Sequence, residues 1–147
     1  MQKTRNLFLG PLLCTAMLST GTLAAGPNIS VYKSPTCGCC SKWVRHLKDN
    51  GFEVETVDLN DLRTVKSMSG IQPEQASCHT ARIGDYVIEG HVPAEDIKRL
   101  LAEQPDARGL TVPGMRMGSP GMESPQPDHY QVLLLDKDGT TSVFAEH

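Results

Sequence analysis

Cysteine spacing is the feature of this sequence that points most directly to chemistry. Cys37 and Cys40 form a C-x-x-C pair, the spacing of thiol–disulfide exchange sites, and Cys39 stands between them. The adjacent Cys39 and Cys40 have Cα atoms about 3.8 Å apart, below the range that a disulfide usually spans. Several thiolates packed this closely, with Cys78 farther along the chain, suit the soft ion Cu(I). The four cysteines are therefore the predicted copper ligands, and Cys37 and Cys40 are the redox candidates.

Two structural roles compete with copper binding at these cysteines. In the first, the disulfides Cys37–Cys40 and Cys39–Cys78 staple a small secreted domain. In the second, a zinc ion is held by the C-x-x-C pair and by Cys78-His79, which gives a cramped geometry for a mononuclear site. Ligand type alone does not separate copper from silver or mercury, so copper is predicted here from the softness of the donors.

Histidine and methionine side chains offer further candidate ligands. His79 and His91 are candidates to complete or tune the site, with an ordinary polar position, partly exposed for His79, as the alternative. Three methionines lie in a loop rich in glycine and proline that has no helical period, and their neutral thioethers are soft donors for Cu(I). Packing over the apolar rim is the alternative for these methionines, which are Met115, Met117 and Met122.

The other histidines are given no ligand role from the sequence. His46 is predicted on the polar side of a helix, and it and His147 are expected to be simply solvated. His129 is left unassigned.

An N-terminal leader precedes all of these residues. Residues 1–25 begin with the basic residues Lys3 and Arg5, continue with an apolar stretch and end in small residues. These are the three parts of a cleavable signal peptide. Its removal takes Cys14 away and lowers the net charge from −3 to −5. The remaining cysteines then lie in an oxidising compartment, predicted to be the periplasm, where each must be paired, metal-bound or redox-active.

Length and charge narrow the classes of function. The 147 residues fit a signal peptide and one domain, predicted over residues 26–147. The acidic balance excludes a general nucleic-acid binder, which needs excess Lys and Arg. After the leader, no segment has the ~20 apolar residues that span a bilayer. The expected partners are therefore metal ions and other periplasmic copper-handling proteins.

The pattern along the chain predicts an α/β domain with the order β-α-β-α-β-β-α. A loop rich in Met, Pro and Gly and an added C-terminal β-hairpin follow. Asp58 or Asn60 is the expected cap of the second helix, and Gly84-Asp85 is the expected hairpin turn. The strands are predicted over 29–33, 52–59, 81–83, 86–88, 130–135 and 142–144, the helices over 43–47, 62–68 and 93–101, and the aperiodic segment over 105–128.

This order of elements would bring the candidate ligands together. The C-x-C-C segment stands between a strand and a helix, where unpaired backbone N–H groups and the helix dipole favour thiolate. Lys33 and Lys42 add local positive charge. If the sheet is thioredoxin-like, the start of the third strand and the exit of the fourth lie at the same edge as this segment. Cys78, His79 and His91 would then join it.

Four segments resemble the CopG-like family of small exported proteins. The resemblance covers essentially the whole chain after the leader and implies a thioredoxin-like fold, a periplasmic location, copper binding at the four cysteines and a role in copper resistance. It also implies a redox role on copper, which would make the protein a copper or thiol oxidoreductase. The matching segments are Ser34-Pro35-Thr36-Cys37-Gly38-Cys39-Cys40, Ser77-Cys78-His79-Thr80, Glu89-Gly90-His91-Val92-Pro93 and Gly109 to Glu123.

The chain departs from ordinary thioredoxins at one position. Cys78 stands where those proteins carry a cis-proline before the third strand, a residue that helps to present a peptide substrate. This difference weakens the alternative function, a general thiol–disulfide oxidoreductase that uses Cys37 and Cys40 with metal incidental.

Overall fold

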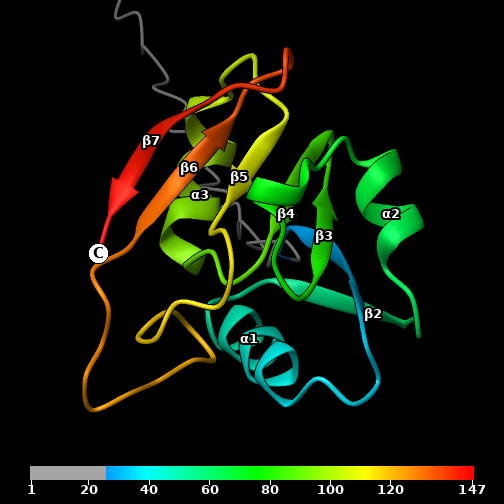
Figure 1. Ribbon diagram of the computed structural model, residues 1–147, viewed down its shortest axis with the longest axis vertical. Helices are drawn as coiled ribbons and strands as arrows, with labels where there is room; N and C mark the ends of the chain where they lie inside the picture. Colours follow the sequence, from blue (N-terminus) through cyan, green and yellow to red (C-terminus); the bar gives the residue numbers. More distant parts are fainter. Residues whose placement is uncertain (1–25) are drawn as a thin grey trace, which may run out of the picture.

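Residues 26–147 are described by the computed structural model, in which a seven-stranded sheet is flanked by α-helices (Figure 1). The predicted leader and Cys14 lie outside these residues. The strands are β1 (Asn28–Lys33), β2 (Glu53–Asp58), β3 (Thr80–Ile83), β4 (Tyr86–Glu89), β5 (Gly109–Thr111), β6 (Gln131–Leu135) and β7 (Thr141–Glu146). The helices are α1 (Gly38–Asp49), α2 (Arg63–Met68) and α3 (Ala94–Glu103), with a 3-10 turn, η1, at Pro73–Gln75.

The sheet is mixed, and its order is β2-β1-β3-β4-β5-β6-β7. Strand β1 runs parallel to β2 and antiparallel to β3, and β3 runs antiparallel to β4. These pairings confirm the predicted α/β class and the predicted order β-α-β-α-β-β-α. The hairpin turn at Gly84-Asp85 and the C-terminal hairpin of β6 and β7 are also confirmed.

The segment predicted to be aperiodic contains a strand. Residues Gly109–Thr111 form β5, which runs parallel to β4 and antiparallel to β6 and so joins the C-terminal hairpin to the rest of the sheet. A Cβ on Gly109 would lie 1.7 Å from the carbonyl oxygen of Val87, so only glycine allows this close pairing. The glycine that reads as a loop signal in the sequence is therefore what lets β5 enter the sheet.

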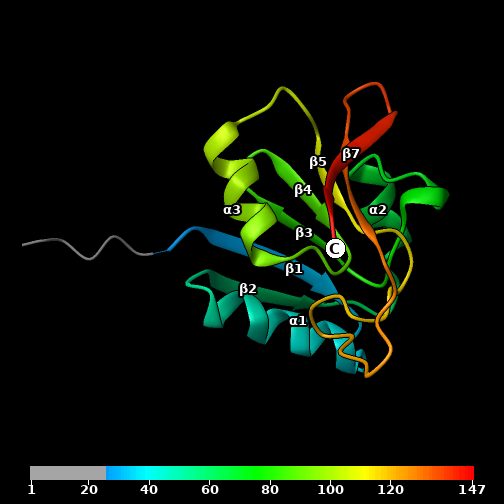
Figure 2. The same ribbon diagram turned by 90° about the vertical axis from the view of Figure 1, so that its left-hand side faces the viewer.

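Apolar side chains from both long helices fill one core with the central strands. Trp43 and Leu47 of α1 and Ile97 and Leu100 of α3 are fully buried, because each helix carries apolar residues at three- and four-residue spacing. Helix α2 lies on the other side of the central strands from α3 (Figures 1 and 2). The core thus fixes α1 against the strands that carry the other candidate ligands.

Helix α2 begins differently from the prediction. Leu62 occupies the N-cap position without a side-chain bond, and neither Asp58 nor Asn60 caps the helix. Asp61 instead accepts from the backbone N–H of Arg63, at 2.9 Å, and pairs with its guanidinium. Among the described residues, no helix has the length and apolar character needed to cross a membrane.

Candidate metal centre

The turn between β1 and α1 presents three of the cysteines. The backbone N–H of Cys37 donates to the carbonyl of Ser34 at 3.1 Å, which closes the turn, and Cys37 becomes the N-cap of α1. Its Sγ accepts from the backbone N–H of Cys40 at 3.3 Å, one of the donors that a helix start leaves unpaired. Cysteine thus takes the capping place that usually belongs to Ser, Thr, Asp or Asn.

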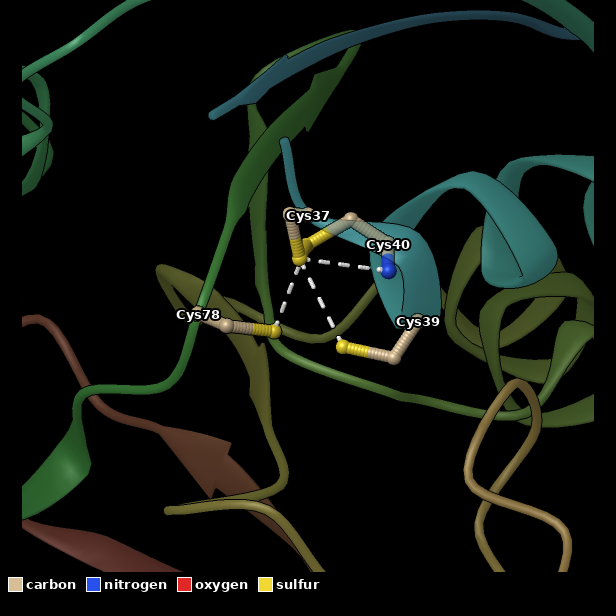
Figure 3. Close-up of side chains that lie close together, drawn as sticks. All are labelled: Cys37, Cys39, Cys40 and Cys78. Atoms are coloured by element: carbon tan, nitrogen blue, oxygen red, sulfur yellow. Dashed lines mark hydrogen bonds between the residues drawn. A yellow bond between two sulfur atoms is a disulfide. The ribbon is translucent and has the colours of Figure 1, made fainter. Parts of the chain in front are cut away.

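Cys37 and Cys40 are joined by a disulfide, and the two remaining thiols lie against it (Figure 3). Cys39 Sγ is 3.4 Å from Cys37 Sγ, and Cys78 Sγ is 3.5 Å from Cys40 Sγ. All four sulfur atoms lie within 4.8 Å of one another and could hold a metal ion. The first disulfide of the stapled alternative is therefore present, whereas its second, Cys39–Cys78, is not, because both residues are free thiols.

Sheet pairing brings the distant candidate ligands to this turn. Tyr32 near the end of β1 pairs with Thr80 at the start of β3, and Thr80 pairs with Glu89 at the end of β4. Cys78 and His79 directly precede β3 and His91 follows β4, so all three lie at the edge where α1 begins. A second group of possible metal ligands, Cys78, His79 and His91, therefore shares Cys78 with the cysteine cluster.

Hydrogen bonds fix the orientation of His91. Its Nδ1 is 2.8 Å from the carbonyl oxygen of Pro120, which can only accept, so Nδ1 carries the proton. Its Nε2 lies 3.0 Å from Cys78 Sγ and accepts from that thiol. Ligating histidines commonly donate their other N–H to a backbone carbonyl, and His91 has this arrangement.

His79 is fully buried, so the alternative of a partly exposed polar position is wrong. Its Nδ1 is 3.3 Å from Cys78 Sγ, and its ring packs against Trp43 with centroids 4.3 Å apart. Its Nε2 has no hydrogen-bond partner among the described residues. The pKa of His79 is well below its ordinary value, mainly because burial removes the ring from water and secondarily because His91 and Lys66 are nearby. The ring is therefore neutral and able to bind a metal.

Burial also controls the protonation of Cys78. The pKa of Cys78 is raised to about 12, mainly because the thiol is removed from water and secondarily because Cys39 is nearby. Desolvation lowers the pKa of His91 as well, so the buried side of the centre is uncharged while the disulfide is in place. A soft cation would replace the thiol proton on Cys78, because metal and proton compete for the same sulfur.

Two solved structures are similar to this chain over nearly its whole described length. They are copper resistance protein CopG in form 1 and form 2, and each matches with a TM-score of 0.79 and 45% sequence identity over 83% of this chain and 98% of the other. The chain belongs to the CopG family. The family model described as "Protein of unknown function, DUF411" matches residues 75–122, which include Cys78, His79 and His91. Comparison with curated proteins gives no match.

The methionine loop of this CopG-family chain covers the centre with its backbone. Pro120 bonds to His91, and a Cβ on Gly121 would lie 2.7 Å from the carbonyl oxygen of Cys39, so the loop and the start of α1 are in close contact (Figure 2). Met115 and Met117 are instead 53% and 40% exposed. The predicted cover over the site is thus formed by Pro120 and Gly121, while the thioether ligand role of Met115, Met117 and Met122 stays a prediction.

The predicted positive charge near the cysteines is largely paired. Lys33 is buried and lies 2.7 Å from Asp58, and Lys42 lies 3.7 Å from Glu123. The charge that these two lysines bring to the turn is therefore partly offset by the two carboxylates.

Two histidines outside the CopG-family centre are not simply solvated. His46 Nε2 accepts from the backbone N–H of Ala94 at 3.1 Å, and desolvation lowers the pKa of His46. His147 Nε2 lies 2.7 Å from Asp96 Oδ2. His129, left unassigned, bonds through Nδ1 to the carbonyl oxygen of His147. The predictions for His46 and His147 failed because their partners are distant in the sequence.

Sequence reasoning missed the buried carboxylate of Glu89. It is fully buried beside the segment that carries Cys78 and His79, and it pairs with Lys66 of α2. A single Glu at the end of a short strand is typical of a surface position, so no sequence signal separates it from a solvated residue.

Proposed function

We propose that this protein is a periplasmic copper-binding protein that holds Cu(I) on the thiolates of its cysteine cluster and acts in copper homeostasis or resistance. The observation that carries the proposal is the convergence of four sulfur atoms to within 4.8 Å of one another. Thiolate donors favour Cu(I) over harder ions, and adjacent thiolates can bridge between ions. The ligands would be Cys37, Cys39, Cys40 and Cys78, with His79 and His91 completing or tuning the site.

Membership of the CopG family supports copper as the metal, since both similar structures are of a copper resistance protein. The strand order β2-β1-β3-β4, with the cysteines at the start of α1, supports a thioredoxin-like topology for the first part of the chain. The features of residues 1–25 support export, after which the chain would act as one domain beside other periplasmic copper-handling proteins.

In this function, the Cys37–Cys40 disulfide links the oxidation state of these two cysteines to the binding of Cu(I). Oxidation of the two metal-bound thiolates to this disulfide would pass two electrons to the disulfide of an external protein, which is reduced to a dithiol as it takes up two protons from solvent, and would withdraw two of the four sulfur donors, so that bound Cu(I) is released. Reduction by an external dithiol reverses both changes and restores the full set of donors. The chain would thus hold copper in its reduced form and release it when oxidised.

A thiol–disulfide oxidoreductase is the second candidate function. The observation that favours it is the disulfide at the start of α1, with the thiol of Cys78 only 3.5 Å from Cys40 Sγ. In this function Cys37 and Cys40 exchange with disulfides of other proteins, and metal binding is incidental.

Anaerobic Cu(I) titration against a competing chelator separates the two functions. The reduced protein should bind Cu(I) tightly, and the disulfide form should bind at least about tenfold more weakly because two donors are withdrawn. Weak one-to-one binding that survives Cys39→Ser would contradict the cluster. Rapid reduction of a model disulfide that only Cys37→Ser or Cys40→Ser abolishes would favour the oxidoreductase. His129→Asn is the matched control, because His129 lies outside both groups of possible ligands.

A further inference from the structure

Glu89 is a buried charged residue that the metal-binding proposal does not use. Its side chain has no exposed surface, and its carboxylate lies at the end of β4 on the strand next to β3. It accepts from the backbone N–H of Ser77 at 2.6 Å and from Thr80 Oγ1 at 2.7 Å. Lys66 Nζ of α2 lies 2.5 Å from the same carboxylate and also donates to Thr80 Oγ1 at 3.1 Å.

The partners of Glu89 stand on both sides of Cys78 and His79. Ser77 directly precedes these two residues and Thr80 directly follows them, so one carboxylate ties both ends of a four-residue segment. The backbone N–H of Gly90 donates to the carbonyl of His79 at 3.1 Å and holds the middle of the segment. The position of Cys78 is therefore set by bonds from Ser77, His79 and Thr80 to Glu89 and Gly90, at the end of β4.

Stability alone gives a poor account of this ion pair. Desolvation raises the pKa of Glu89, and Lys66 and the two hydrogen bonds oppose that rise. Burying two charges is costly, and well-packed apolar residues of similar volume often replace a buried ion pair without loss of stability. The carboxylate of Glu89 accepts hydrogen bonds from both Ser77 and Thr80, and these two bonds fix the distance between Cys78 and the disulfide. Apolar packing would not fix this distance.

We propose that Glu89, supported by Lys66, is a positioning residue for the cysteine cluster. Its carboxylate holds the segment Ser77–Thr80 so that Cys78 Sγ stays 3.5 Å from Cys40 Sγ. The consequence for copper rests on the function proposed above, whereas the placement of Cys78 is tested without metal.

The direct test is the reactivity of Cys78 in the disulfide form of the full chain. Glu89→Gln keeps the shape of the side chain but removes its charge and replaces one accepting oxygen by an NH₂ donor, so the bonds to Ser77, Thr80 and Lys66 are weakened. Iodoacetamide labelling followed by peptide mass spectrometry should show Cys78 modified about tenfold faster than in the wild type. Thr80→Val removes the bond that Thr80 Oγ1 donates to Glu89 and the bond that it accepts from Lys66, with little change of shape, and should give a smaller increase.

Asp96→Asn is the matched control, because Asp96 is also a buried carboxylate, and it binds His147 away from the cysteines. It should leave the labelling of Cys78 unchanged, which separates positioning from a general loss of stability. An unchanged rate in both Glu89→Gln and Thr80→Val would overturn the proposal.

A second readout uses the reduced protein and Cu(I). Glu89→Gln should lower the affinity for Cu(I) about tenfold, toward that of Cys78→Ser, while the Cys37–Cys40 disulfide still forms at the wild-type rate. If the wild type itself fails to bind Cu(I), the proposed function fails, and the labelling experiment still decides the role of Glu89. Unchanged affinity in Glu89→Gln together with unchanged labelling contradicts the positioning role alone.

Discussion

The two sides of the candidate metal centre are built in different ways. The α1 turn supplies Cys37, Cys39 and Cys40 from four consecutive residues, held by a helix start. The buried side supplies Cys78 and two histidines from the ends of two strands, held by the sheet and by Glu89. The turn carries the disulfide, whereas the thiol and the imidazoles of the buried side stay uncharged. In the proposed function, the turn would supply the redox change and the buried side would set the geometry.

The largest expected effect comes from removing one partner of the disulfide. In oxidised Cys37→Ser, Cys40 should pair with Cys78, because their sulfur atoms lie 3.5 Å apart and Cys40 does not pair with the adjacent Cys39. Peptide mapping by mass spectrometry should find this disulfide in nearly all chains. Cys39→Ser is the matched control and should keep Cys37–Cys40. A free Cys40 in the oxidised variant would show that the two sides do not meet in solution.

The residue that links the two sides should matter most for stability. Trp43 of α1 is fully buried, donates from Nε1 to the carbonyl of Val92 at 2.8 Å, and packs against His79. Trp43→Ala should lower the free energy of unfolding by about 3–5 kcal/mol in urea denaturation. Met68→Ala, at a position 78% exposed, should change it by less than about 0.5 kcal/mol. If Trp43→Ala lowers the free energy of unfolding by less than ~1 kcal/mol, the Trp43 ring does not hold the α1 turn against the buried side.

Thiol reactivity against pH should separate the buried side from an ordinary thiol. The pKa of Cys78 is raised to about 12 in the folded disulfide form, so its thiolate fraction grows throughout the mildly alkaline range. Its alkylation rate should therefore rise about tenfold per pH unit from pH ~8 to ~10. In urea the same rate should level off near pH ~9, because the unfolded thiol has an ordinary pKa. A plateau near pH ~9 in the folded protein would contradict the burial of Cys78.

The smallest effect is expected at the far end of α1. His46→Leu leaves the backbone N–H of Ala94 without its acceptor and should lower the free energy of unfolding by about 1 kcal/mol. Burial lowers the pKa of His46 below its ordinary value of 6.5. The neutral ring therefore stabilises the fold fully above pH 6.5, and this contribution is lost as the pH falls through the pKa of the folded protein. The difference between variant and wild type should therefore shrink toward pH ~5. A constant difference across this range would rule out the neutral ring as the acceptor.

Prediction from sequence succeeded where the determining interactions are local. The C-x-C-C segment, the hairpin at Gly84-Asp85 and the helix that follows Pro93 depend on neighbouring residues, and each is where the sequence indicates. Cys78 could be expected at the cluster only through an assumed sheet order, which the pairing of β1 with β3 supports.

The failures have a common physical cause, which is pairing across long sequence distances. The strand β5 has only three residues and depends on β4 and β6 for its hydrogen bonds, so no periodic pattern could reveal it. Glu89 and His46 are polar residues whose partners lie far away in sequence, at Ser77 and Ala94. Composition gives the usual expectation of exposure for such residues, and only the fold corrects it.

The central claim is that both sides act as one copper site, and loss of Cys78 tests it most directly. Reduced Cys78→Ser and reduced wild type should be titrated side by side with Cu(I) under anaerobic conditions, with a chelator as competitor. The account predicts that Cys78→Ser binds less copper per chain and binds it at least about tenfold more weakly, although the α1 turn keeps its three cysteines. Equal stoichiometry and equal affinity in the two proteins would contradict it, because the turn alone would then be the site.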